Sequence, residues 1–209
     1  MIKTSQKNIE NIKTILLEKY KEAKTELNYK TDYQLLISII LSAQCTDKRV
    51  NLITPPLFEK YPSTKELAKA NIEEVKELLK SCSFFNNKAK NIILMAQKVE
   101  SEFNGEIPHD HKKLMSLAGV GNKTANVFLI EQDNENRMAV DTHVFRTSHR
   151  LGLSDAKNVE LTEKDLVQAF KTELATLHQA LVLFGRYICT AKNPKCNECF
   201  LKQFCKEKF

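Results

Sequence analysis

The segment from Tyr33 to Gln44 restricts the fold more than any other part of the chain, because its residues are apolar almost all round a helix. A helix without a polar face has to be buried, and it needs other elements packed on every side. Apolar residues elsewhere recur with a helical period, and the sequence contains no convincing pair of alternating strands. The pattern therefore predicts an all-α fold of about ten short helices around a buried central one.

Local signals predict where these helices begin and end. Thr31 or Asp32 can cap the central helix, and Pro55-Pro56 predicts either a helix end near Thr54 or a kink there. Further helices are expected around residues 9–20, after the capping boxes at 63–66 and 71–74, at 89–103 with a stop at Asn104-Gly105, and at 112–117, 142–151, 163–170 and 174–187.

The composition favours a soluble protein with an anionic partner. Lys and Arg exceed Asp and Glu by 32 − 26 = +6, a mildly basic balance that permits nucleic-acid binding without requiring it. The N-terminal segment has no continuous apolar stretch of the kind found in signal peptides, and no segment is long enough to span a membrane. We therefore expect a cytoplasmic protein whose six cysteines bind metal or do redox chemistry rather than form disulfides.

A glycine-punctuated turn, Leu117 to Gly121, precedes a helical segment that starts at Asn122. Such a turn between two helices can expose the backbone N–H groups of Gly119, Val120 and Gly121, and the next helix adds the positive end of its dipole. Together they would bind a nucleic-acid phosphate. The alternative is a glycine that only ends the first helix in a tight connection, and the turn alone does not decide between the two.

Lys123 lies in the first turn of the second of these helices. The positive end of the helix dipole and partial burial would both lower the pKa of its ammonium, which makes a neutral, nucleophilic amine easier to reach. The alternative is a solvated surface lysine, which is the commonest environment of this side chain.

Asp141 ends an apolar triplet and precedes Thr142-His143. As the N-cap of the next helix it would be rigidly placed and ionised. Near Lys123, such a carboxylate could stabilise positive charge developing on a sugar and help to move protons. His143 is expected to be a packed helix residue rather than a ligand.

Four cysteines lie within a short polar segment at the C-terminal end of the chain: Cys189, Cys196, Cys199 and Cys205. Four thiolates so close together predict a metal site, and an all-cysteine set suits either a [4Fe–4S] cluster or zinc. Spacing alone does not distinguish the two. The other cysteines, Cys45 and Cys82, are expected to be ordinary buried or half-buried thiols.

Taken together, these motifs resemble the endonuclease III branch of the helix-hairpin-helix DNA glycosylases. The resemblance covers nearly the whole chain, and the combination is far more specific than any one motif. It is carried in family order by Leu41-Ser-Ala-Gln-Cys-Thr-Asp47, Asn87-Lys-Ala-Lys-Asn-Ile92, Leu117-Ala-Gly-Val-Gly-Asn-Lys-Thr-Ala125, Val140-Asp-Thr-His143, Gly185-Arg-Tyr-Ile-Cys189 and the cysteine spacing. In this family the four cysteines hold a [4Fe–4S] cluster.

The resemblance also implies roles for individual residues. Lys123 falls on the lysine that attacks C1′ of a damaged nucleotide and forms a Schiff base, after which β-elimination cuts the strand 3′ to the lesion. Asp141 falls on the catalytic aspartate, and the turn from Gly119 to Gly121 falls on the hairpin that grips a phosphate. The remaining DNA contacts are implied for Gln44, for Phe84 or Phe85 as an intercalating wedge, and for Lys192 and Lys195.

By the same resemblance, the partner is double-stranded DNA that contains oxidised pyrimidines or abasic sites, and the protein is expected in the bacterial cytoplasm, associated with the nucleoid through DNA binding. A monomer is expected because the sequence leaves no long apolar stripe over. Two lobes with a DNA-binding cleft between them are expected. One lobe spans residues 25–134, and residues 1–24 with 135–209 form the other. The adenine glycosylase branch of the superfamily needs a carboxylic acid on the first buried helix. No Asp or Glu lies between Tyr33 and Thr46, which argues against that branch.

Two positions and the character of the wedge, which is aromatic rather than aliphatic, depart from the family pattern. Many members have Pro where this chain has Ala118 and Glu where it has Met115. The first change should loosen the hairpin slightly, and the second removes a carboxylate. The rival hypotheses are a non-catalytic DNA-binding module and a zinc-stabilised nucleic-acid binder.

Overall fold

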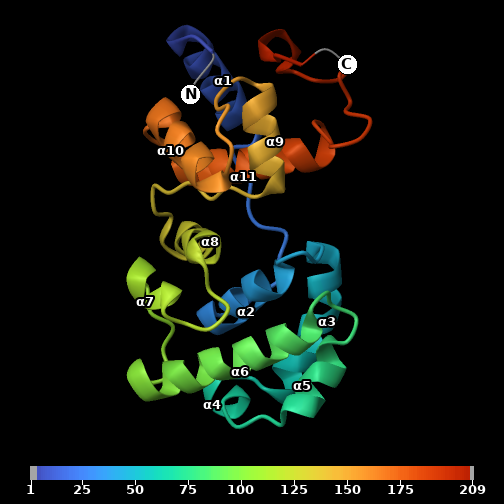
Figure 1. Cartoon of the computed structure of the whole chain (residues 1–209), viewed down its shortest axis with the longest axis vertical. Coiled ribbons are helices and arrows are strands. Elements are labelled where there is room, and N and C mark those ends of the chain that lie inside the picture. Colours follow the sequence, from blue (N-terminus) through green and yellow to red (C-terminus); the bar gives the residue numbers. More distant parts are fainter. Residues whose placement is uncertain (1–3, 208–209) are drawn as a thin grey trace. The chain divides into compact units, whose positions relative to one another are not determined.

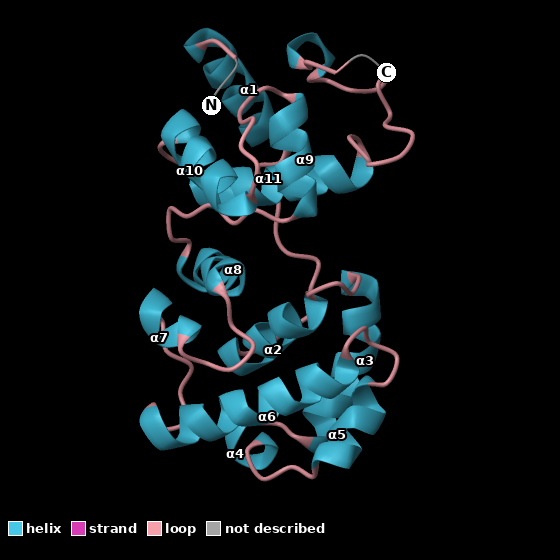
Figure 2. Cartoon of the chain, in the orientation of Figure 1, coloured by secondary structure: helices cyan, strands magenta, loops and turns pink. Residues whose placement is uncertain are grey.

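The computed structural model describes residues 4–207, and this part of the chain contains helices and loops but no strand (Figures 1 and 2). The all-α prediction is confirmed. The helices are α1 (Gln6–Lys19), α2 (Asp32–Ser42), α3 (Asp47–Lys60), α4 (Thr64–Leu67), α5 (Ile72–Leu79), α6 (Phe85–Glu102), α7 (His111–Met115), α8 (Asn122–Asp133), α9 (Thr142–Arg150), α10 (Val159–Phe170) and α11 (Leu174–Tyr187), followed by a 3-10 turn η1 (Lys202–Phe204).

The helices form two compact units. The continuous unit is Glu26–Asp133, and the discontinuous unit contains the described residues up to Thr25 and from Asn134 onward. None of the helices in the described range is long and apolar enough to cross a membrane.

Helix α2 is the central element of the continuous unit, as its apolar sequence predicts. Eight of its residues, from Tyr33 to Leu41 with one interruption, are buried, and it packs against α3, α6 and α8 (Figure 1). Thr31 is the N-cap, and its side-chain oxygen accepts a hydrogen bond from the Gln34 backbone N–H. The helix ends at Ser42, two residues before the predicted end, because Ala43 leaves the helical region with a ψ of 113°, and Gln44 follows with a left-handed φ of 54°.

Helix α3 continues through Pro55 and Pro56, so a helix end near Thr54 is wrong. Each proline removes one backbone donor, but its fixed φ is compatible with a helix. The buried side chains of Val50 and Leu57 hold the segment on both sides of the proline pair. Burial of Leu57 after the proline pair therefore helps to offset the two lost backbone hydrogen bonds.

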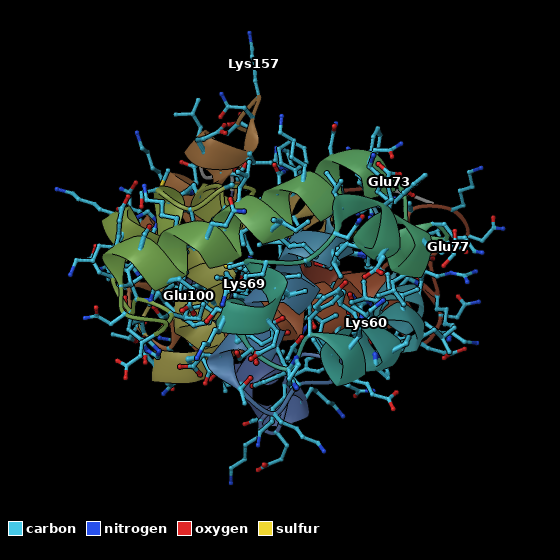
Figure 3. The ribbon with its side chains drawn as sticks, turned by 90° about the horizontal axis from the view of Figure 1, so that it is seen from below. Lys60, Lys69, Glu73, Glu77, Glu100 and Lys157 are labelled. Carbon is cyan, nitrogen blue, oxygen red and sulfur yellow. The ribbon has the colours of Figure 1, made fainter. Side chains whose placement is uncertain are left out.

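The outer side of the continuous unit is polar. Lys60 at the end of α3 and Glu73 and Glu77 on α5 extend outward from the ribbon (Figure 3). Lys60 Nζ pairs with Glu74 at 2.8 Å, an exposed ion pair that contributes little to stability. Charged side chains therefore lie on the solvent side of α5 and at the end of α3, whereas Leu52 within α3 is apolar and exposed.

The discontinuous unit is built from α1, α9, α10 and α11. Its core holds the predicted stripe of α1, Ile9, Ile12 and Leu16, together with much of α11. Gly185 allows α9 and α11 to cross closely, because a Cβ there would lie 2.9 Å from the Cβ of His143. Helix α11 has the predicted bounds, whereas α10 begins four residues before the predicted start, because Asn158 caps it.

Candidate functional site

The turn between α7 and α8 contains two glycines with different structural roles. Gly119 has a φ of +80°, and a Cβ there would lie 3.0 Å from the Cβ of Asn91 on α6. Both its backbone conformation and its packing therefore require glycine. Gly121 is exposed, and nothing lies within 4 Å of a Cβ placed there. Since the fold of the chain does not require glycine at this position, Gly121 is free to serve the close approach of a ligand backbone.

Some backbone N–H groups of the turn already donate hydrogen bonds within the turn. The Val120 backbone N–H donates to the Leu117 carbonyl at 3.2 Å, and the Val120 side chain is buried, so this N–H is not the exposed donor that the sequence predicts. Helix α8 starts at Asn122, and the backbone N–H groups of its first turn point back along the axis toward the turn. A helix start of this kind, next to an exposed glycine, favours an anion.

Lys123 is the second residue of α8, and its side chain is exposed. The partial burial expected from the sequence is wrong, because the buried run of α8 begins only at Ala125 and extends to Ile130. The amine is thus accessible to a large substrate, in the first turn of the helix that follows Gly121.

Three exposed residues of the continuous unit share an uncommon backbone conformation, and one of them, Asn104, lies in the turn after α6. Gln44, after α2, has a φ of 54°, and Phe84, before α6, has a φ of 58°. Phe84 is 61% exposed, whereas Phe85 opens α6 and is only half-exposed. Left-handed φ at non-glycine residues is rare and concentrates at functional sites. Of the two predicted wedge residues, Phe84 is therefore the one presented to solvent.

Lys88 connects the loops of Gln44 and Phe84, and its role is not evident from the sequence. It is buried, and its Nζ donates to the carbonyls of Leu41 at 2.8 Å and Ala43 at 2.6 Å, which end α2. The same Nζ lies 3.2 Å from the Cys82 sulfur. Lys88 belongs to the family motif Asn87-Lys-Ala-Lys, so the motif marks the segment. Nothing in the sequence indicates that this lysine is buried.

Asp141 caps α9 in the discontinuous unit, as predicted. Its Oδ1 accepts hydrogen bonds from the backbone N–H groups of His143 and Val144, both at 2.8 Å. His178 on the buried α11 bonds through Nδ1 to the Ala139 carbonyl at 2.8 Å, which fixes the apolar triplet before Asp141. His143 is half-buried and packs against Gly185, so its predicted packing role is confirmed.

The four C-terminal cysteines line one cavity of about 310 Å³ in the discontinuous unit. Arg150 on α9 holds the loop, since its Nη1 donates to the Cys189 sulfur at 3.3 Å and to the Thr190 carbonyl at 2.8 Å. Within residues 4–207, no three His, Cys, Asp or Glu side chains meet closely enough to hold a single metal ion. The thiols therefore surround a volume instead of converging on a single point.

Comparison with known proteins identifies the family. The HhH-GPD superfamily of base excision DNA repair proteins matches residues 37–172, and the iron-sulfur binding domain of endonuclease III matches residues 189–205. Endonuclease III of Rickettsia felis is 45% identical over 87% of this chain and 86% of its own length. The Escherichia coli enzyme is 38% identical over 94% of both chains. The chain belongs to the endonuclease III family.

A solved structure extends this similarity to three dimensions. A trapped covalent intermediate of endonuclease III with DNA superposes with a TM-score of 0.93, at 37% identity, over 98% of this chain and 97% of the other. The chain is accordingly a base excision DNA repair glycosylase. This identity excludes the zinc-stabilised binder, because the matched cysteine domain binds iron and sulfur.

The cysteine cavity fits the [4Fe–4S] cluster of the endonuclease III family. Burial raises the pKa of the Cys199 and Cys205 thiols, and the neighbouring thiolates raise it further. A cluster coordinated by four thiolates offsets this repulsion with the positive charge of iron. Cys189, Cys196, Cys199 and Cys205 would hold it, and the exposed Lys192 and Lys195 lie on the loop between the first two of these cysteines.

Proposed function

We propose that this endonuclease III family member is a bifunctional DNA glycosylase and AP lyase that removes oxidised pyrimidines from duplex DNA. The observation that carries the proposal is the exposed amine of Lys123, in the first turn of α8 directly after the open Gly121. A phosphate bound at this turn would bring a sugar within reach of the amine, and binding at a helix start favours the anion.

The proposed reaction begins with neutral Lys123. Its Nζ forms a bond to C1′ of the damaged nucleotide, and the glycosidic bond breaks with its electron pair leaving on the base, which takes up a proton. Ring opening then gives a Schiff base between Nζ and C1′. Loss of a proton from C2′ and departure of the 3′ phosphate complete the β-elimination, and hydrolysis releases the lysine.

Asp141 is proposed to stabilise the positive charge that develops on the sugar and to help move protons. The two hydrogen bonds from the start of α9 hold its carboxylate in one orientation, which suits an electrostatic role because no reorganisation is needed during the reaction.

The exposed loops are proposed to contact the duplex. Phe84 would enter the base stack and Gln44 would occupy the space left by the flipped nucleotide, while Lys192 and Lys195 would neutralise phosphates. We propose a monomer with two domains, divided as the two compact units are.

Borohydride trapping on a duplex with one thymine glycol tests the proposal. Wild type should give a covalent protein–DNA adduct, and Lys123→Gln should give none while still binding the duplex. An adduct of normal yield from Lys123→Gln would contradict the assignment of the nucleophile. If wild type traps on an abasic site but not on thymine glycol, the lyase assignment stands and the proposed lesion is wrong.

A further inference from the structure

Lys88 on α6 is a buried lysine to which the proposed reaction gives no role. Only 6% of its surface is exposed. An ammonium group has three N–H donors and no acceptor. Its Nζ has three partners, the Leu41 carbonyl at 2.8 Å, the Ala43 carbonyl at 2.6 Å and the Cys82 sulfur at 3.2 Å. The donors of the amine are therefore all engaged inside the protein, and Lys88 acts on other residues rather than on a phosphate or a substrate.

The partners of Lys88 lie at the bases of the two loops that are proposed to enter the duplex. Ala43 directly precedes Gln44, and Cys82 lies two residues before Phe84. The backbone N–H of Lys88 also donates to the Phe84 carbonyl at 3.1 Å. That backbone bond would form with any residue except proline. The side chain is what ties the start of α6 to the end of α2.

Both loops have a backbone conformation that needs such support. Gln44 and Phe84 have φ values of 54° and 58°, in the left-handed region that residues with a Cβ avoid unless their surroundings hold them there. Phe84 is the N-cap of α6, and its side chain makes no capping hydrogen bond. The conformation of each loop therefore depends on neighbouring contacts, and Lys88 supplies contacts to both.

We propose that Lys88 is a positioning residue for lesion recognition, which holds Gln44 and Phe84 in the conformation in which they enter an opened base stack. The inference rests on the proposed function, which assigns these two residues to the duplex. A side chain that is already held in its bound geometry loses little conformational freedom when it inserts. Lys88 should therefore strengthen binding where the stack is opened and leave phosphate contacts to an undamaged duplex unchanged.

A ratio of two affinities tests this role on the holoenzyme. Fluorescence anisotropy gives the affinity for an undamaged duplex and for the same duplex with one tetrahydrofuran abasic analogue. Lys88→Met removes the donors and keeps a long apolar stem, so it should lower the ratio of abasic to undamaged affinity about tenfold, the order expected for one poorly inserted aromatic side chain. An inactive fraction of the protein cancels in this ratio. Lys90→Met makes the same charge change at an exposed position of α6 and should keep the wild-type ratio.

A double-mutant cycle shows whether Lys88 acts through the wedge. Phe84→Ala should lower the same ratio by a similar factor, because the inserted ring is lost. In the double variant the loss should be clearly smaller than the product of the two single losses, since Lys88 has no ring left to position. Losses that multiply in full would show that Lys88 and Phe84 act independently, which would overturn the proposal.

Hydrogen exchange of the free holoenzyme tests the anchoring without any DNA. In Lys88→Met, amides in the segments 43–46 and 82–86 should exchange about tenfold faster than in wild type, because buried carbonyls lose a charged donor. Amides of α8, in the same unit, should keep their wild-type rates. Equally faster exchange throughout the unit would mean that Lys88 only stabilises the fold, and the positioning role would be wrong.

A wild-type affinity ratio in Lys88→Met overturns the proposal. If that variant does not fold, Lys88→Gln replaces it, because its shorter amide can donate to at most two of the three partners and should also lower the ratio. A wild-type ratio in folded Lys88→Gln would be equally contrary. A wild-type protein that does not prefer the abasic duplex would contradict the proposed function, whereas the exchange measurement would still decide whether Lys88 anchors the two loops.

Discussion

The two residues proposed for catalysis stand at the starts of two helices, but the fold holds them differently. Asp141 lies before the first turn of α9, and two backbone N–H groups fix its carboxylate. Lys123 lies inside the first turn of α8 and extends into solvent. The carboxylate is therefore part of the folded scaffold, whereas the amine is a flexible group that a substrate has to order. It follows that removing Asp141 should affect both stability and activity, and removing Lys123 should affect activity alone.

Lys123→Gln should have the largest effect on the reaction. Loss of the nucleophile should lower strand cleavage at an abasic site by at least about 10³-fold. The melting temperature should stay within about 1 °C of wild type, because substitutions of exposed residues change stability little. Single-turnover cleavage and calorimetry on the same preparation measure both quantities. A large loss of stability would mean that Lys123 holds α8 in place, and the contrast with Asp141 would fail.

Asp141→Asn and Asp141→Ala separate charge from capping. Asparagine still caps a helix, so the Asn variant should keep its stability and lose about 10²-fold in cleavage. Alanine removes both hydrogen bonds, so this variant should also lose about 1 kcal/mol of unfolding free energy. Urea titrations of the three proteins check the difference. Equal stability of the Asn and Ala variants would show that the cap contributes nothing.

Gly119→Ala and Gly121→Ala separate a structural role from a DNA-binding role within the hairpin. A methyl group at Gly119 requires a strained φ and approaches Asn91, so it should cost about 1–3 kcal/mol of unfolding free energy. The same change at Gly121 meets open space, so stability should stay within about 0.5 kcal/mol of wild type. The Gly121 variant should instead weaken DNA binding, measurable by fluorescence anisotropy. Full affinity in that variant would argue against phosphate binding at the turn.

The sequence predicted the helices and their caps better than the burial or exposure of individual side chains. The uniform apolar pattern of α2, the exact span of α11 and the capping role of Asp141 depend on local rules that act within a few residues. The exposure of Lys123 and the burial of Lys88 depend on which side of a helix meets its neighbours. A single lysine carries no local mark of that choice, since its long stem can be buried while its amine finds carbonyls.

His109 anchors the C-terminal end of α8, and its substitution should have the smallest effect of the changes considered. Its Nδ1 lies 2.8 Å from Asp133 and its Nε2 lies 2.8 Å from Asp32 at the start of α2. Both partners only accept hydrogen bonds, so the doubly protonated ring satisfies both. Burial lowers the pKa of His109, but hydrogen bonds to Asp133 and Asp32 outweigh it, and the net pKa is raised above 6.5.

A raised pKa in the folded state means that the folded protein binds the proton more tightly than the unfolded chain. The stabilisation should therefore be complete below about pH 6.5 and disappear as the pH rises through the folded-state pKa. Because the side chain is partly exposed, solvent screening should keep the effect under about 1 kcal/mol. Urea titrations of wild type and His109→Gln from pH 5 to 9 should differ at the acid end and converge at the alkaline end. A constant difference across this range would mean that His109 stabilises α8 by packing on Phe128, where the rings meet edge-on at 5.3 Å, and that its charge is irrelevant.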